Sequence, residues 1–250
     1  MSVFATYEYT LGSRDIDPFG QCRPSALLGI LQEAATHAAC ALHVSREETL
    51  EAYNAFWMLV RMWYRLDRPV GMEETLTVKT WHRGGRGAST YRDYDIYVDG
   101  TRVGEGVSTW VLADQDTHKL LRMSGVKEFA GTDGGELCKD KLLGRVCLPR
   151  EMALAERRLL HYSDADVNGH VNNTRYADFV CDALHMEGLG TGQFVSSLQV
   201  GFLHECRPGE ALDLWVGQEE GAHYVHGTGV EGDSRFDAAL TLSPLPVGHP

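Results

Sequence analysis

The chain has 250 residues, of which 43% are hydrophobic and 23% are charged. This composition is typical of a globular protein with a real apolar core and excludes a disordered chain. The net charge of −12 argues against nucleic acid as a partner, because an acidic surface repels phosphates. No run of 18 apolar residues occurs, so we expect no membrane span.

The six cysteines are scattered and form no C-x-x-C pair, which indicates reduced thiols and no zinc site. Residues 1–8 have neither the basic and apolar regions of a secretion signal nor the composition of a transit peptide. We therefore expect a cytoplasmic protein. No motif calls for a metal ion or a cofactor.

The first predicted helix follows the segment 15–20, which reads Asp-Ile-Asp-Pro-Phe-Gly. Pro24 suits its opening turn. Apolar residues then recur three and four apart, as on the buried face of a helix: Leu27, Leu31, Ala34, Ala38 and Leu42. A strand-like run leads from there to Arg68-Pro69, and Asp99-Gly100 between apolar residues predicts a hairpin.

Residues 123–148 are expected to link two units. The segment 131–135 reads Gly-Thr-Asp-Gly-Gly, as expected of a loop. Four apolar residues indicate that the linker is partly ordered: Val126, Phe129, Leu142 and Leu143. The glycine-rich residues 81–87 lack the Gly-Lys-Ser/Thr ending of a phosphate loop, so a hairpin turn is the preferred interpretation.

The segment 164–173 repeats the first loop at a constant offset of 149 residues, which is the spacing from Asp15 to Asp164 and from Gly20 to Gly169. A second apolar helical face begins after it, with Asn172 and Asn173 suited to capping: Tyr176, Phe179, Val180, Ala183 and Leu184. A strand-like run again reaches an Arg-Pro pair, at 207–208. The first copy has about ten more residues between loop and turn.

The repeat predicts an α+β fold, in which each of two units has a long helix packed on an antiparallel β-sheet. We expect an N-terminal unit at 1–122, a linker at 123–148 and a C-terminal unit at 149–250.

The later loop has the residue types that acyl-transfer chemistry needs. Asp166, Asn168 and His170 supply an acceptor, an amide and a titratable ring where a helix begins. An Asx-rich capping turn would explain one Asn and one Asp, but not the alternating His. In the first copy, Gln21 stands in place of His170 and Phe19 in place of Asn168, so the chemistry is expected in the C-terminal unit.

The chain resembles the acyl-acyl carrier protein thioesterases of the bacterial type, which have a tandem double hotdog fold. The similarity includes residues 25–35 as the first helix, the strands from 57 to 81, and the loop Asp-x-Asn-x-His-x-Asn-Asn at 166–173. It also includes an acidic residue followed by Cys about 35 positions after the His, here Glu205 and Cys206. The resemblance implies catalytic roles for Asp166, Asn168, His170 and Glu205, with Asn172 and Asn173 positioning the substrate.

The resemblance further implies hydrolysis of acyl-acyl carrier protein to free fatty acid, which ends fatty-acid elongation. The partner would be acyl carrier protein with its phosphopantetheine-linked acyl chain, and the N-terminal unit would accommodate that chain. The oligomeric state, monomer or dimer, stays open. Two alternatives also stay open: an acyl-coenzyme A thioesterase, and a non-hydrolytic acyl-binding or hydratase hotdog protein.

Several mechanisms fit these residues. Glu205 or His170 would take a proton from water, while Asn168 and backbone N–H groups orient the carbonyl and Asp166 fixes the donors. A rival mechanism makes Asp166 a covalent nucleophile. If 198–206 is a regular strand, Cys206 shares the apolar face with Leu198 and Val200 and Glu205 faces the other side, so we favour Glu205 over Cys206.

Overall fold

The computed structural model describes residues 4–129, 134–139, 142–188 and 192–246. The chain forms two compact units. The first unit comprises residues 1–11, 29–64 and 73–143, and the second comprises 12–28, 65–72 and 144–250. The linker expected at 123–148 therefore separates the strands of the two units, whereas the first-copy loop packs with the second unit.

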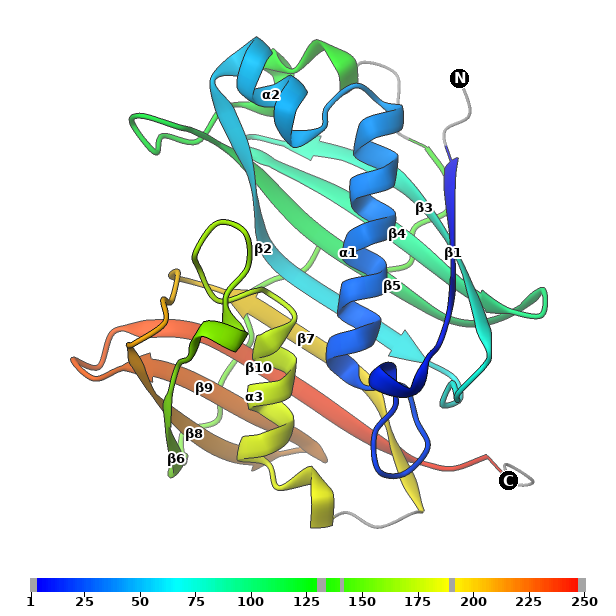
Figure 1. Cartoon of the computed structure of the whole chain (residues 1–250), viewed down its shortest axis with the longest axis vertical. Coiled ribbons are helices and arrows are strands. Elements are labelled where there is room, and N and C mark those ends of the chain that lie inside the picture. Colours follow the sequence, from blue (N-terminus) through cyan, green and yellow to red (C-terminus); the bar gives the residue numbers. More distant parts are fainter. Residues whose placement is uncertain (1–3, 130–133, 140–141, 189–191, 247–250) are drawn as a thin grey trace. The chain divides into compact units, whose positions relative to one another are not determined.

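The first unit is a five-stranded sheet with a long helix on one face (Figure 1). The strand order is β1-β3-β4-β5-β2, and the pairs β1–β3, β3–β4 and β4–β5 are antiparallel. The strands are β1 (Phe4–Thr10), β2 (Ala55–Leu66), β3 (Thr75–Arg86), β4 (Ser89–Val98) and β5 (Thr101–Asp114). Helix α1 (Pro24–Ala41) begins at the predicted proline, and its predicted apolar face is buried at Leu27, Leu31, Ala34 and Ala38.

The predicted hairpin turn is confirmed at Asp99 and Gly100, between β4 and β5. Both residues have a positive φ, 48° and 73°. This is the backbone of a type I′ turn, which matches the twist of the two strands it joins. The glycine-rich residues 81–87 are likewise a strand end and hairpin turn, with Gly87 at a φ of 65°.

A short helix that the periodicity did not predict, α2 (Arg46–Tyr53), lies in the stretch where the first copy has its extra residues. Ser45 caps it: the Ser45 hydroxyl accepts from the Glu48 N–H at 3.3 Å, and the Glu48 carboxylate accepts from the Ser45 N–H at 2.9 Å. This reciprocal capping box is visible in the sequence as Ser-x-x-Glu.

The second unit repeats the design with a shorter helix. Its strand order is β7-β10-β9-β8-β6, with antiparallel pairing throughout. The strands are β6 (Ala153–Leu159), β7 (Gln193–Phe202), β8 (Ala211–Glu219), β9 (Ala222–Gly229) and β10 (Ser234–Pro244). Helix α3 (Arg175–Ala183) has only nine residues, so the expectation of a long helix in each unit holds for α1 alone. The Tyr176 ring packs edge-on against Phe202 and Phe236, at 5.5 and 5.0 Å between centroids.

Five single-turn 3₁₀ helices complete the described secondary structure: η1 (Ser13–Asp15), η2 (Met123–Gly125), η3 (Lys127–Phe129), η4 (Tyr162–Asp164) and η5 (Met186–Gly188). No helix in the described ranges is both long and apolar enough to cross a membrane.

The expected linker is partly ordered, as its apolar residues indicated. Met123 and Val126 are buried in one cluster of the first unit, and Leu143 is buried in another. The loop predicted at 131–135 lies largely outside the described residues, which include only its Gly134 and Gly135.

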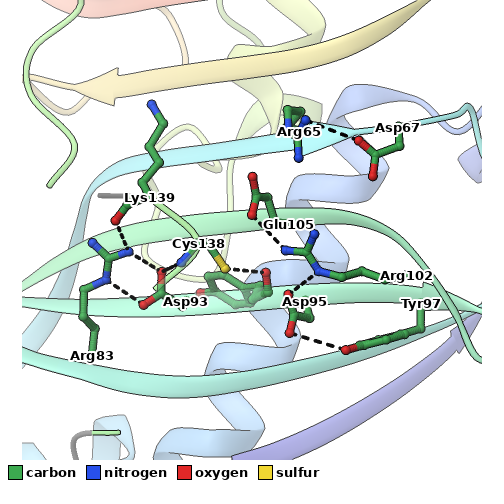
Figure 2. A network of polar contacts seen from close by, with 11 residues as sticks. Arg65, Asp67, Arg83, Asp93, Asp95, Tyr97, Arg102, Glu105, Cys138 and Lys139 are labelled. Carbon is green, nitrogen blue, oxygen red and sulfur yellow. Dashed lines mark hydrogen bonds and ion pairs between the residues drawn. The ribbon is translucent and has the colours of Figure 1, made fainter. Parts of the chain in front are cut away.

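A polar network on the first sheet holds part of this linker (Figure 2). Arg83 makes a bidentate pair with Asp93, at 2.6 and 2.7 Å, and these side chains are 6% and 0% exposed. Arg83 also donates to the Lys139 carbonyl at 3.0 Å, and the Cys138 N–H donates to Asp93 at 3.4 Å. Burial and nearby carboxylates, Asp93 first, raise the pKa of the Cys138 thiol to about 12.

Candidate active site

The two loops of the sequence repeat have matching hydrogen bonds. Asp15 accepts from an N–H three residues before it at 2.8 Å, and Asp164 does the same at 2.8 Å. Gly20 and Gly169 both have a left-handed backbone, with φ of 81° and 75°. One isolated β-bridge closes each loop, Ile16–Cys22 and Ala165–Val171, again 149 residues apart. The duplication inferred from the sequence is therefore confirmed in the backbone.

The second loop brings an imidazole and a carboxylate together. His170 Nε2 lies 3.3 Å from Glu205 Oε2, with side chains 24% and 47% exposed. The backbone explains this contact, because the Val171 N–H donates to the Cys206 carbonyl at 2.8 Å. That bond joins the backbone next to His170 to the backbone next to Glu205. His170 and Glu205, 35 positions apart, form a pair that water can reach.

Asp166 holds the loop around Asn168. Its Oδ1 accepts from the Asn168 N–H at 2.8 Å, and its Oδ2 accepts from the Asn168 side-chain amide at 3.3 Å. The Asp166 N–H donates to the His170 carbonyl at 2.8 Å, which closes the turn. Both carboxylate oxygens of Asp166 are thus occupied by donors of one asparagine, as a positioning group requires.

Most backbone donors of the loop are used inside it. Five N–H groups are donated to loop or neighbouring acceptors: those of Asp166, Asn168, Gly169, Val171 and Asn172. The expectation that nearby backbone N–H groups hold a substrate carbonyl is therefore wrong for these five. The exposed Asn168 side chain still has one amide N–H that Asp166 does not use.

The two asparagines expected at the helix boundary lie three and two residues before its first residue. Helix α3 starts at Arg175, after Thr174. Asn172 Oδ1 accepts from the Thr174 N–H at 2.9 Å and from its hydroxyl at 2.8 Å, which is an Asx turn. Asn173 is half-buried next to it. Asn172 therefore shapes the chain between the loop and α3, and its amide N–H groups have no hydrogen-bond acceptor among the described residues.

Cys206 is fully buried, with 0% exposed. Burial raises the pKa of its thiol, and a hydrogen bond with Tyr176 acts in the opposite direction. The strand expected through 206 is wrong in detail, because β7 ends at Phe202 and the next two N–H groups both donate to the Arg235 carbonyl. Strict alternation is lost there, yet Glu205 is exposed and Cys206 is buried, as predicted.

Two residues that support the site were not singled out from the sequence. Asp164 is 3% exposed and pairs with Arg175 at 3.2 Å, which anchors the loop to the start of α3. Arg235 donates to the Glu205 carbonyl at 2.6 Å and to Glu210 at 3.1 Å. The repeat of Asp15 at 164 was a signal for the first, but nothing in the sequence connects Arg235 to Glu205.

A second His–carboxylate pair lies in the same unit, between β9 and β10. His226 Nδ1 lies 2.6 Å from Asp237 Oδ1, and His226 Nε2 lies 3.5 Å from the Ser234 hydroxyl. The order of groups is that of a serine hydrolase, but 3.5 Å is longer than a nucleophile–base hydrogen bond. No cluster of metal-ligating side chains occurs in the part of the chain that the structure describes.

Each half of the chain matches a known family. Residues 2–129 match the acyl-ACP thioesterase N-terminal domain, and residues 151–241 match the acyl-ACP thioesterase C-terminal domain. A double hotdog with a polar loop at the second helix is the class that the fold and the site define. The chain belongs to the acyl-ACP thioesterase family.

Relatives and solved structures agree with this membership. The chain is 23% identical to the chloroplastic oleoyl-acyl carrier protein thioesterase of Coriandrum sativum, over 77% of this chain and 57% of that protein. It is also 23% identical to the chloroplastic oleoyl-acyl carrier protein thioesterase 1 of Arabidopsis thaliana, over 87% of this chain and 66% of that protein. It thus spans less than two thirds of these relatives.

Two solved structures share the fold over nearly the whole of both chains. An acyl-ACP thioesterase of Bacteroides thetaiotaomicron superimposes with a TM-score of 0.86 at 20% identity, covering 97% of this chain and 100% of the other. The 12:0-ACP thioesterase of Umbellularia californica gives 0.81 at 18% identity, covering 98% of each.

Proposed function

We propose that the chain hydrolyses acyl-acyl carrier protein to a free fatty acid and carrier protein, and so ends fatty-acid elongation. The observation that carries this proposal is the 3.3 Å contact between His170 and Glu205 in a loop that the other copy retains without its His. Family membership of both halves supports the thioester as the bond that is cut.

In this proposal His170 and Glu205 act as one general base. The His170–Glu205 pair takes a proton from a water molecule, and the water oxygen attacks the thioester carbonyl carbon. The C–S bond then breaks. The proton then passes to the leaving phosphopantetheine sulfur. The free amide N–H of Asn168 donates to the carbonyl oxygen as negative charge develops there.

Asp166 is assigned a positioning role, because both its oxygens bind Asn168. The rival role, a covalent acyl-Asp166, makes a distinct prediction. In a single turnover in ¹⁸O-water, direct attack puts the label into the fatty acid alone. Label recovered in Asp166 would overturn the positioning role and establish the covalent route.

The two halves of the chain are assigned different roles because their loops differ in sequence. We propose that residues 149–250 carry the chemistry and that residues 1–122 accommodate the acyl chain, with 123–148 as the linker. In the first copy, Asp17 still accepts from two N–H groups of its loop, at 2.9 Å each. Gln21, in place of His170, donates to the Gln193 carbonyl at 2.9 Å, so that loop supplies no titratable ring.

The partner and the compartment belong to the same proposal. The partner is acyl carrier protein with a phosphopantetheine-linked chain. Six unpaired cysteines support a reducing compartment such as the cytoplasm.

The test compares one acyl chain on two carriers. Release of free thiol from octanoyl-, dodecanoyl- and oleoyl-carrier protein is measured beside the same acyl groups on coenzyme A. We expect the larger kcat/KM on carrier protein for at least one chain. Equal or faster turnover of the coenzyme A thioesters would make this an acyl-coenzyme A thioesterase, and no thiol from any substrate would support a non-hydrolytic protein.

A further inference from the structure

Glu205 lies on a short segment, residues 203–206, that has left the sheet. Strand β7 ends at Phe202, so the pairing with β10 no longer fixes the backbone of this segment. The Glu205 side chain is 47% exposed, and His170 is its only polar contact among the residues that the structure describes. The position of the Glu205 carboxylate therefore depends on what holds the backbone of residues 203–206.

Arg235, the second residue of β10, holds that backbone with three hydrogen bonds. Its carbonyl accepts from the N–H of Leu203 at 2.9 Å and from the N–H of His204 at 3.1 Å. Its guanidinium donates to the Glu205 carbonyl at 2.6 Å. Three consecutive residues are thus bound to one arginine. The two backbone bonds would survive a substitution at position 235, whereas the bond to the Glu205 carbonyl needs the side chain.

Two carboxylates hold the Arg235 guanidinium in turn. Arg235 Nε lies 2.6 Å from Asp233 Oδ2, and Arg235 Nη1 lies 3.1 Å from Glu210 Oε2. The Arg235 side chain is only 21% exposed. A charged donor also makes a stronger hydrogen bond to a carbonyl than a neutral donor does. The guanidinium is therefore a fixed support for Glu205, and Asp233 would still hold it if Glu210 alone were neutralised.

The first copy has the matching backbone bond without an acid beside it. The Cys22 N–H donates to the Val70 carbonyl at 2.7 Å, in the place of the bond that joins the second loop to residue 206. The residue before Val70 is Pro69, so a proline stands where the second copy has Glu205.

The arginine at the equivalent strand position of the first copy has a different task. Arg102 is the second residue of β5, as Arg235 is of β10. Its guanidinium lies between Asp95 and Glu105, at 2.7 and 2.8 Å (Figure 2). The arginine thus binds carboxylates of its own sheet in the copy without the acid, and the backbone of the acid in the copy that has one.

We propose that Arg235 is a positioning residue, which sets the Glu205 carboxylate beside His170 through its bond to the Glu205 carbonyl. This inference rests on the proposed function and adds to it a residue that touches neither the substrate nor the water. A displacement of about 1 Å in a reacting group can cost about 100-fold in rate. The loss of the Arg235 side chain should therefore appear in kcat, and KM should change little.

Arg235→Met removes the donor, and Arg158→Met is the matched control. The Arg158 side chain is 22% exposed and pairs with Asp182 at 2.7 Å, without a hydrogen bond to residues 203–206. With acyl-carrier protein as substrate, we expect kcat of Arg235→Met to fall roughly 10- to 100-fold with KM within about twofold of wild type. Arg158→Met should keep its kcat. A wild-type kcat in Arg235→Met, or a change confined to KM, would overturn the proposal.

A double-mutant cycle separates positioning from a general structural role. In a Glu205→Gln background the acid is already gone, so adding Arg235→Met should change kcat by less than about twofold. A further fall of about tenfold or more would show that Arg235 acts independently of Glu205, and would overturn the proposal. If Arg235→Met does not fold, Glu210→Gln with Asp233→Asn replaces it, because this double variant frees the guanidinium from both carboxylates. Its kcat should fall, and a wild-type kcat would overturn the proposal.

Nuclear magnetic resonance of the His170 ring gives a readout that does not need turnover. The ring signals, assigned with His170→Gln, should move in the same direction in Arg235→Met and in Glu205→Gln, and should stay in place in Arg158→Met. This pattern in a chain that releases no thiol from any thioester would keep the role of Arg235 and refute the proposed function. Unmoved His170 signals and a wild-type kcat in Arg235→Met would keep the function and refute this inference.

Discussion

Glu205→Gln is the substitution that most directly tests the proposed chemistry. It removes the carboxylate charge 3.3 Å from His170 and keeps the size of the side chain. General acid–base groups contribute about 10²- to 10⁴-fold to rate, which corresponds to about 2.7–5.5 kcal/mol. The same pair contributes about 1 kcal/mol or less to stability, because its side chains are 24% and 47% exposed.

Glu205→Gln should therefore lower activity far more than it lowers stability. We expect kcat/KM on acyl-carrier protein to fall at least about 100-fold, while Tm moves by no more than about 4 °C. Thiol release gives the rate, and calorimetry gives the Tm. His170→Gln is measured in parallel: an equal loss identifies both residues as parts of one base, whereas a smaller loss in Glu205→Gln identifies Glu205 as the group that orients the ring.

Two control variants make the test specific. Glu210→Gln removes a carboxylate that pairs with Arg235 at 3.1 Å and lies five positions further on, and it should keep the rate. His226→Gln disrupts the other His–carboxylate pair of the second unit. A Glu205→Gln rate within about threefold of wild type, or a loss found only in His226→Gln, would refute the assignment.

Three further predictions concern stability and the thiol. Asp93→Asn should lower the free energy of unfolding, measured in urea, by about 3–5 kcal/mol, because it leaves the buried Arg83 guanidinium uncompensated. Asp95→Asn breaks a more exposed pair and should lower it by about 1 kcal/mol or less. Similar losses in the two variants would contradict the argument from burial. Cys206→Ala should keep most of the turnover of the wild type, because burial raises the pKa of the thiol and disfavours a thiolate nucleophile. Turnover below roughly a hundredth of wild type in a folded variant would favour Cys206 over Glu205 as the catalytic residue. Hydrogen bonding from Arg157 lowers the pKa of Asp213, so their pair stabilises the fold above about pH 4 and less as the pH falls through the lowered pKa. The Tm difference between wild type and Asp213→Asn should therefore shrink on acidification, and a difference that grows instead would contradict the sign.

The parts of the fold that local patterns determine could be predicted from the sequence. The buried face of α1, its opening at Pro24 and the turn at Asp99 and Gly100 follow from periodicity and backbone preference. The repeat at an offset of 149 predicted two similar units. The capping box that starts α2 was also visible in the sequence, at Ser45 and Glu48, although periodicity alone missed that helix.

The sequence named His170 and Glu205 as candidates, and the structure places them 3.3 Å apart, but the hydrogen bonds around them could not be predicted. The loop motif located His170, and family resemblance located Glu205. The bond between the Val171 N–H and the Cys206 carbonyl, which brings the two together, joins segments distant in sequence and leaves no local signal. For the same reason the sequence did not reveal that Asp166 is occupied by Asn168, or that β7 ends before Cys206.

The replacement of His170 by Gln21 in the earlier copy has a genetic consequence. When two identical subunits associate, a codon change alters both, so neither can abandon its reactive loop while the other keeps it. Fusing the duplicates frees each half to mutate separately, so the half that has Gln21 in place of the histidine can change without altering the His170 loop of the other half. Titration with a mechanism-based inactivator should accordingly find one reactive equivalent per polypeptide.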